Sequence, residues 1–167
     1  MGQQPVGSQE RMGEAQRELL KRFHDEHREL QRMLQELRRR VRDAAASAGA
    51  GSAGAQARSE AEALLRKLEE LLPRHFASEQ RAGFLTQAVS QAPRLSRRAE
   101  ELRAEYAKLT DGLTALSARM RRAGPETKRW LQLDAACRRF TDALDDHEHR
   151  ENALIHEAWV EDIGAVD

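Results

Sequence analysis

Two short segments of the sequence place a histidine four residues before a glutamate. They read HFASE over residues 75–79 and HEHRE over residues 147–151. Residues i and i+4 of an α-helix lie on the same face, one turn apart. His75 with Glu79, and His147 with Glu151, would therefore each present an imidazole and a carboxylate to one point. Imidazole nitrogens and carboxylate oxygens are ligands of non-haem iron and manganese, so the spacing indicates metal chemistry inside a helical protein.

The segments that must position these residues are predicted to be helical. Ala, Arg, Glu, Leu and Gln dominate the chain, whereas aromatic residues make up 4% and there are four prolines, which favours helix nearly throughout. Three breaks divide the sequence: a Gly/Ala/Ser-rich segment that predicts a flexible loop over residues 44–57, the segment around Pro93, and the Gly-Pro pair at 124–125. The helices are then expected over residues 9–45, 58–91, 94–122 and 126–160.

Short connections make successive helices antiparallel, which predicts an all-α fold, an up-down-up-down four-helix bundle. We expect one domain over residues 9–164, preceded by a flexible N-terminus over residues 1–8. Two tryptophans near the ends of the last helix, Trp130 and Trp159, either mark a dimer contact or pack against the core.

Each predicted helix has one apolar face, on which residues recur at alternating spacings of three and four. Polar residues interrupt all of these faces: His27 on the first helix, His75 and Glu79 on the second, Tyr106 on the third, and His147 and Glu151 on the fourth. Taken singly, a buried His is more often a hydrogen-bonded core residue, and Tyr106 more often a packing residue. Their occurrence on every face favours a shared site, because carboxylates buried without compensation cost several kcal/mol each.

Distances along the helices test whether these residues lie at one level of the bundle. At a rise of about 1.5 Å per residue, His27 and His75 lie at nearly equal distances from the adjoining ends of the first and second helices. Glu79 and Tyr106 likewise lie at equal distances from the adjoining ends of the second and third helices. The distances of Tyr106 and His147 from the adjoining ends of the third and fourth helices differ by more than one turn. Of the other histidines, His24 lies one turn from His27 and is an outer or substitute ligand at most. His149 and His156 are rotated off the apolar face.

Composition excludes several classes of function. The chain has 28 basic and 28 acidic residues, so its net field predicts no nucleic-acid partner and no anionic membrane partner. A single cysteine, Cys137, excludes an intramolecular disulfide and fits a reducing compartment, so we expect a cytoplasmic protein without a leader or membrane span. There is no HExxH zinc-protease motif. The ExxH pair of ferritin-like di-iron bundles is also missing.

With FHDEHREL around His27, then HFASEQ, then HEHREN followed by EAWVEDIG, the chain resembles the hemerythrin-like (HHE cation-binding) family from about residue 15 to 164. This resemblance implies a four-helix bundle that holds two irons, bridged by carboxylates and an oxo or hydroxo group. Such proteins bind oxygen or nitric oxide, sense oxygen or iron, or handle peroxide. The residues that match the family's ligands are His27, His75, Glu79, His147 and Glu151.

The third helix departs from the family pattern. The family normally has a His in a segment like LxxEH, whereas this chain has LRAEY, with Tyr106 in that place. Fewer imidazoles and a phenolate that favours ferric iron argue against reversible oxygen carriage. They favour either oxidative or peroxide chemistry, with a role in oxidative stress, or a sensing role.

We therefore expect a non-haem di-iron binding protein, a monomer or homodimer, with O2, NO or peroxide as its small ligand. One alternative is a di-iron oxidase or peroxidase that consumes its ligand. Another is an interaction module whose degenerate site holds one zinc or nothing. A single iron bound by two His and one carboxylate, or manganese, also remains open.

Overall fold

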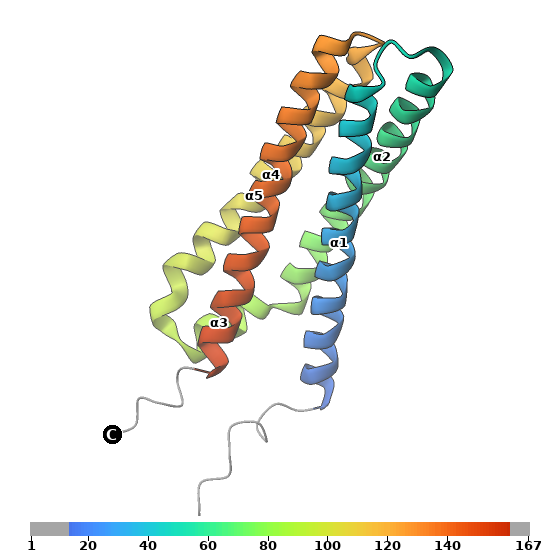
Figure 1. The fold of residues 1–167 in the computed structure, drawn as a ribbon. Coiled ribbons are helices and arrows are strands. Elements are labelled where there is room, and N and C mark those ends of the chain that lie inside the picture. Colours follow the sequence, from blue (N-terminus) through green and yellow to red (C-terminus); the bar gives the residue numbers. More distant parts are fainter. Residues whose placement is uncertain (1–13, 161–167) are drawn as a thin grey trace, which may run out of the picture.

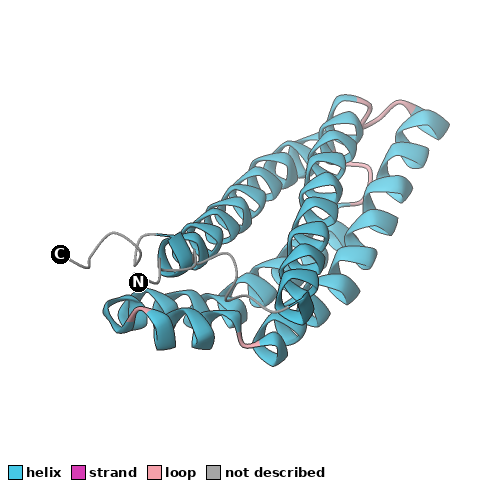
Figure 2. Cartoon of the chain, turned by 90° about the horizontal axis from the view of Figure 1, so that it is seen from below, coloured by secondary structure: helices cyan, strands magenta, loops and turns pink. Residues whose placement is uncertain are grey.

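The structure is a computed structural model that describes residues 14–160, and this part of the chain is helical and contains no strand (Figures 1 and 2). The predicted flexible N-terminus over residues 1–8 lies outside the described residues. The elements are α1 (Glu14–Ala46), α2 (Gly51–Ala82), α3 (Phe84–Gln91), the 3-10 helix η2 (Pro93–Leu95), α4 (Ser96–Ala123) and α5 (Thr127–Val160).

The four long helices pack around one core. Helix α1 contacts α2 and α5, and α4 also contacts both α2 and α5. The α1–α2 and α4–α5 connections lie at one end of the molecule, and the short helix α3 lies near the other (Figure 1). The predicted apolar faces are confirmed as the buried faces: their members are buried in all four long helices, apart from the half-buried Leu20 and Ala82.

The predicted loop over residues 44–57 is wrong for most of its length. Helix α1 continues to Ala46 and α2 begins at Gly51, so only residues 47–50 connect them. The alanines have high helix propensity, and Ala44 and Ala45 are buried against the core. Gly54 allows α2 to approach the turn closely, because a Cβ there would lie 2.3 Å from the Ser47 carbonyl oxygen.

The predicted second helix is interrupted at Gly83. Its φ of 69° is a left-handed conformation that glycine adopts without strain, and its N–H donates to the Glu79 carbonyl 3.0 Å away. The chain then turns into α3, whose Leu85 and Ala88 are buried in a cluster with Leu154 of α5. Glu79 therefore lies in the last turn of α2, directly before this bend.

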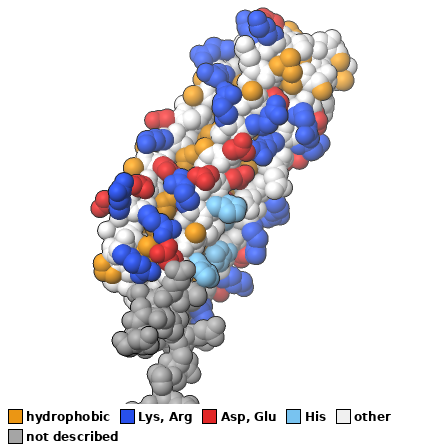
Figure 3. Space-filling view, turned by 60° about the vertical axis from the view of Figure 1, so that its left-hand side comes forward, with side chains coloured by type: hydrophobic (Ala, Val, Ile, Leu, Met, Phe, Trp, Pro, Cys, Tyr) orange, Lys and Arg blue, Asp and Glu red, His pale blue; other side chains and the backbone are white. Residues whose placement is uncertain are grey.

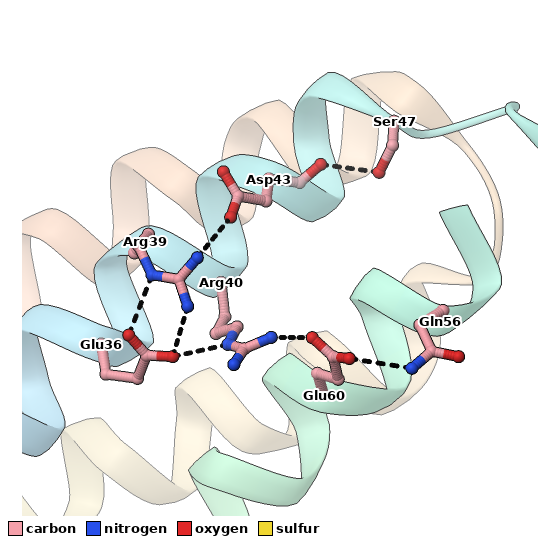
Figure 4. A network of polar contacts seen from close by, with 7 residues as sticks. All are labelled: Glu36, Arg39, Arg40, Asp43, Ser47, Gln56 and Glu60. Atoms are coloured by element: carbon pink, nitrogen blue, oxygen red, sulfur yellow. Dashed lines mark hydrogen bonds and ion pairs between the residues drawn. The ribbon is translucent and has the colours of Figure 1, made fainter. Parts of the chain in front are cut away.

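Ion pairs cover the surface of the bundle. Arg39 and Arg40 both pair with Glu36, and Arg40 reaches across to Glu60 of α2 (Figure 4). Basic and acidic side chains are interspersed over the face shown in Figure 3. None of the helices in residues 14–160 is long and apolar enough to cross a membrane.

Candidate metal centre

His27 of α1 and His75 of α2 both contact the carboxylate of Glu79, also on α2. Its Oε1 lies 2.7 Å from the Nε2 of His27 and 2.7 Å from the Nε2 of His75. The three side chains are buried, and their candidate ligand atoms all lie within 4.8 Å of one another. Two imidazoles and one carboxylate on a single point, shielded from water, are a donor set that fits a metal ion.

Helices α4 and α5 bring their polar residues to the same region. The Tyr106 hydroxyl donates a hydrogen bond to Glu151 Oε1 at 3.2 Å, and Glu151 Oε2 lies 3.9 Å from His27 Nε2. The His147 ring lies 5.4 Å from the Tyr106 ring, centroid to centroid. All of the six residues selected from the sequence are thus buried in one cluster.

The predicted difference in depth between Tyr106 and His147 is therefore wrong. The Trp130 indole donates to the Gly124 carbonyl at 2.7 Å, so Trp130, and not the first residue of α5, lies level with the end of α4. The number of residues from Tyr106 to the end of α4 at Ala123 equals the number from Trp130 to His147. Tyr106 and His147 therefore lie at the same level of the bundle. Trp130 is fully buried, so here it packs within the chain and is not exposed for a dimer contact.

Several buried polar atoms of the cluster lack a hydrogen bond among the described residues. They are His75 Nε2, which approaches Glu79 without hydrogen-bond direction, Glu79 Oε2, His147 Nε2 and Glu151 Oε2. Buried polar atoms are nearly always satisfied in folded proteins. Because these are nitrogen and carboxylate donors, a bound cation would satisfy them, and the residues present therefore fit a metal.

The two glutamates differ in their affinity for a proton. Burial would raise the pKa of Glu79, but its contacts with His27 and His75 outweigh burial and hold the pKa at about 2. Burial, reinforced by the charge of Glu79, raises the pKa of Glu151 to about 9. Without a cation, the pair therefore carries one negative charge at neutral pH.

Burial and the nearby glutamates also affect the other groups. Burial, and then the charges of Glu151 and Glu79, raise the pKa of Tyr106 far above its usual range, so that it remains a phenol without a cation. Burial lowers the pKa of His27. Burial acts to lower the pKa of His75, but its contact with Glu79 and the charges of Glu79, Glu148 and Glu26 together raise it.

Sequence reasoning missed two acidic residues beside this cluster. Glu148 is 1% exposed, and neither of its carboxylate oxygens has a hydrogen bond of good geometry among the described residues. Burial raises the pKa of Glu148 to about 8. The signal for its burial was a second stripe on α5, formed by Thr141, Leu144, Glu148, Glu151 and Ile155. Glu105 of α4, the residue before Tyr106, contacts His147.

The remaining histidines lie outside the cluster. His24, His149 and His156 are exposed, and the Nδ1 of His149 lies 3.1 Å from the Asp145 carbonyl oxygen of its own helix. Their exposure agrees with the prediction that His149 and His156 face away from the core. His24 is not brought into the cluster.

Aromatic rings close one end of the cluster, and two clefts reach it. The Phe23 ring packs 4.0 Å from the His27 ring and 4.7 Å from the Phe84 ring, centroid to centroid. One cleft of about 370 Å³ is lined by Phe23, Glu79 and Phe84. A smaller one of about 170 Å³ is lined by Glu79, Gly83 and Tyr106. Both clefts lead from the surface to Glu79.

Comparison with known proteins identifies the family. The family model described as hemerythrin HHE cation binding domain matches residues 18–159. Neither the curated proteins nor the solved structures gave a match to this chain. The matched residues span most of the 167-residue chain and contain the whole cluster of buried His, Glu and Tyr side chains. The chain therefore belongs to the hemerythrin HHE cation-binding domain family.

Proposed function

We propose that the chain is a non-haem di-iron binding protein of the hemerythrin type. It would bind or sense O2 or NO, or handle peroxide, at a carboxylate-bridged site inside an up-down-up-down bundle. The observation that carries the proposal is the convergence of His27 and His75 on one oxygen of Glu79, each at 2.7 Å, in the buried interior of the bundle. The cytoplasm is its proposed location, and a monomer or homodimer its proposed state.

Six side chains would hold the metal: His27, His75, Glu79, Tyr106, His147 and Glu151. Two six-coordinate irons need about twelve ligand positions. Three imidazoles, two bridging carboxylates and one phenol supply about eight of these. An oxo or hydroxo bridge would take about two more, which leaves positions open. When bound, iron would supply redox chemistry and open positions for a small ligand.

The surrounding residues favour a ligand of a few atoms. The Phe23 ring packs on the His27 ring and Phe84 packs on Phe23, so apolar rings cover His27 on this side. The cleft of about 170 Å³ that ends at Glu79 and Tyr106 has room for a diatomic gas or peroxide. Glu151 holds one proton next to the Tyr106 hydroxyl, because its pKa is raised to about 9. Two ionised carboxylates would require release of this proton, so metal binding is coupled to proton loss.

One observation favours the enzymatic alternative, a di-iron oxidase or peroxidase. Tyr106 occupies the position where the family has a His, and its ring lies beside His147. A phenolate stabilises ferric iron more than an imidazole does, which disfavours return to the reduced state that reversible oxygen binding needs.

Titration of the iron-loaded protein with NO, O2 and hydrogen peroxide tests the proposal. A binding or sensing protein gives a stoichiometric change in the visible spectrum that saturates with at least one of these ligands. Sustained consumption of hydrogen peroxide assigns the chain to the enzymatic alternative. Iron-loaded protein that responds to none of the three contradicts both, and supports the interaction module with a degenerate or single-metal site.

A further inference from the structure

His147 has a partner outside the cluster that the sequence patterns did not indicate. Its Nδ1 lies 2.8 Å from Oε2 of Glu105 on α4. The same oxygen accepts a hydrogen bond from Arg150 Nη2 at 2.6 Å, and Arg150 Nε donates to Asp146 at 2.8 Å. Glu105 therefore lies between a buried imidazole and a guanidinium that is itself fixed to α5.

This contact determines which nitrogen of His147 carries the proton. A carboxylate only accepts hydrogen bonds, so Nδ1 must donate, and Nε2 keeps its lone pair. The opposite tautomer would place two lone pairs against each other at 2.8 Å. It would also bury an N–H at Nε2, where no described residue accepts a hydrogen bond. The imidazole thus presents a bare nitrogen to the interior.

Glu105 is the closest acceptor on the outer side of any of the three buried imidazoles. His75 Nδ1 lies 3.5 Å from Glu26, a side chain that is 46% exposed. His27 Nδ1 lies 3.4 Å from the side-chain amide of Asn152. Carboxylates that hold the second nitrogen of a histidine fix its orientation and raise its basicity towards a metal.

We infer that Glu105, held by Arg150, is a positioning residue that fixes His147 with Nε2 directed into the cluster. The orientation of His147 is a property of the protein without metal, whereas its effect on metal affinity rests on the proposed function. The alternative is that Glu105 and Arg150 form only a surface ion pair that joins α4 to α5.

The chain offers a matched control for that alternative. Glu157 of α5 pairs with Arg98 of α4, between the same two helices, and also with Arg94 of η2. The Glu157 side chain is 22% exposed and the Glu105 side chain 26%, but Glu157 has no contact with the buried cluster among the described residues. Removing Glu157 thus removes ion pairs at a site of comparable exposure and removes no partner of the three buried histidines.

The first experiment reads the His147 tautomer by ¹⁵N NMR of the imidazoles in the full chain without metal. We expect Nδ1–H with a bare Nε2 in the wild type and in E157A, and loss of this preference in E105A. E105Q keeps an acceptor for Nδ1–H and should preserve the tautomer, which also covers the case in which E105A does not fold. An unchanged tautomer in E105A, or a wild type protonated at Nε2, would overturn the inference.

The second experiment measures affinity for Fe2+ under anaerobic conditions. We expect about 10- to 100-fold weaker binding in E105A and a change of less than about twofold in E157A. The groove between α4 and α5, about 580 Å³ in volume, is lined by Glu105 and Arg150 at one end, so added acetate can reach the space vacated in E105A. Acetate should partly restore Fe2+ affinity in E105A and leave the wild type unchanged.

The two experiments separate the inference from the proposed function. If the wild type binds no Fe2+, the proposed function fails, and the tautomer measurement still decides the role of Glu105. If the wild type binds Fe2+ and E105A binds it as tightly as E157A does, then Glu105 is only an ion-pair partner and the inference fails.

Discussion

The Glu79 carboxylate of α2 lies 2.7 Å from the His27 imidazole of α1, in the buried centre of the bundle. The two residues are 52 positions apart in the chain, so the contact exists only when the helices are packed. The contact gives the carboxylate a partner while no metal is bound. His75 contacts the same carboxylate oxygen, so the three side chains lie together. The same geometry thus serves the stability of the metal-free protein and its capacity to bind a cation.

Tyr106 should give the ferric protein a visible signature. If its phenolate binds iron, the iron-loaded wild type shows a tyrosinate-to-iron charge-transfer band, and Y106F lacks it. Y106F should still fold but unfold at a somewhat lower denaturant concentration, because it loses one buried hydrogen bond, worth about 1 kcal/mol. A band that persists unchanged in Y106F would place Tyr106 outside the iron ligands.

The metal-free protein should lose stability as the pH rises from about 6.5 to about 9. Burial raises the pKa of Glu148 to about 8, and burial with the Glu79 charge raises that of Glu151 to about 9. In this window the folded state retains protons that the unfolded chain has released, so the free energy of unfolding falls as the pH rises. The expected loss is on the order of 5 kcal/mol, measured by urea unfolding at both pH values.

Two variants identify the source of this pH dependence. E148Q removes one of the titrating carboxyls and should reduce the loss. E36Q should leave it unchanged, because Arg39 and Arg40 hold the pKa of the surface residue Glu36 at about 2, far below the window. Stability that is constant or increases between pH 6.5 and 9 would contradict the raised pKa values.

Gly83 should be required for the bend between α2 and α3. Its φ is 69°, and a Cβ would meet no atom within 4 Å, so G83A is disfavoured by backbone conformation alone, by about 1 kcal/mol. Gly112 is the control. A Cβ there lies in ordinary contact, 3.5 Å from the Phe140 ring, so G112A should stabilise its helix by about 0.5 to 1 kcal/mol. Equal effects of the two substitutions on urea unfolding would refute this explanation.

Local sequence patterns predicted the helices and their buried faces well. The reason is physical: apolar residues at spacings of three and four define a helix face wherever the helix packs. The positions of His27, His75, Glu79, Tyr106, His147 and Glu151 followed from interruptions in those faces. Their convergence in space, however, required the packed structure.

Features that depend on neighbouring helices were not predictable in this way. A segment rich in glycine and alanine reads as a loop, yet α2 begins at Gly51 because the helices approach closely around Gly54. A lone glycine within a helical pattern is ambiguous, and the bend at Gly83 follows from the packing of α3 on α5. Glu105 lies next to the apolar face of α4, and its contact with His147 depends on how α5 packs there.

Metal analysis of the protein purified from iron-replete cells shows whether the buried cluster binds two irons. We expect about two irons per chain and a higher unfolding temperature on iron loading. H27A should lose this metal, whereas H24A should retain it, because His24 is exposed one turn away on the same helix. Protein that is purified without iron, and whose unfolding temperature does not change when iron is added, would show that the cluster is not an iron site.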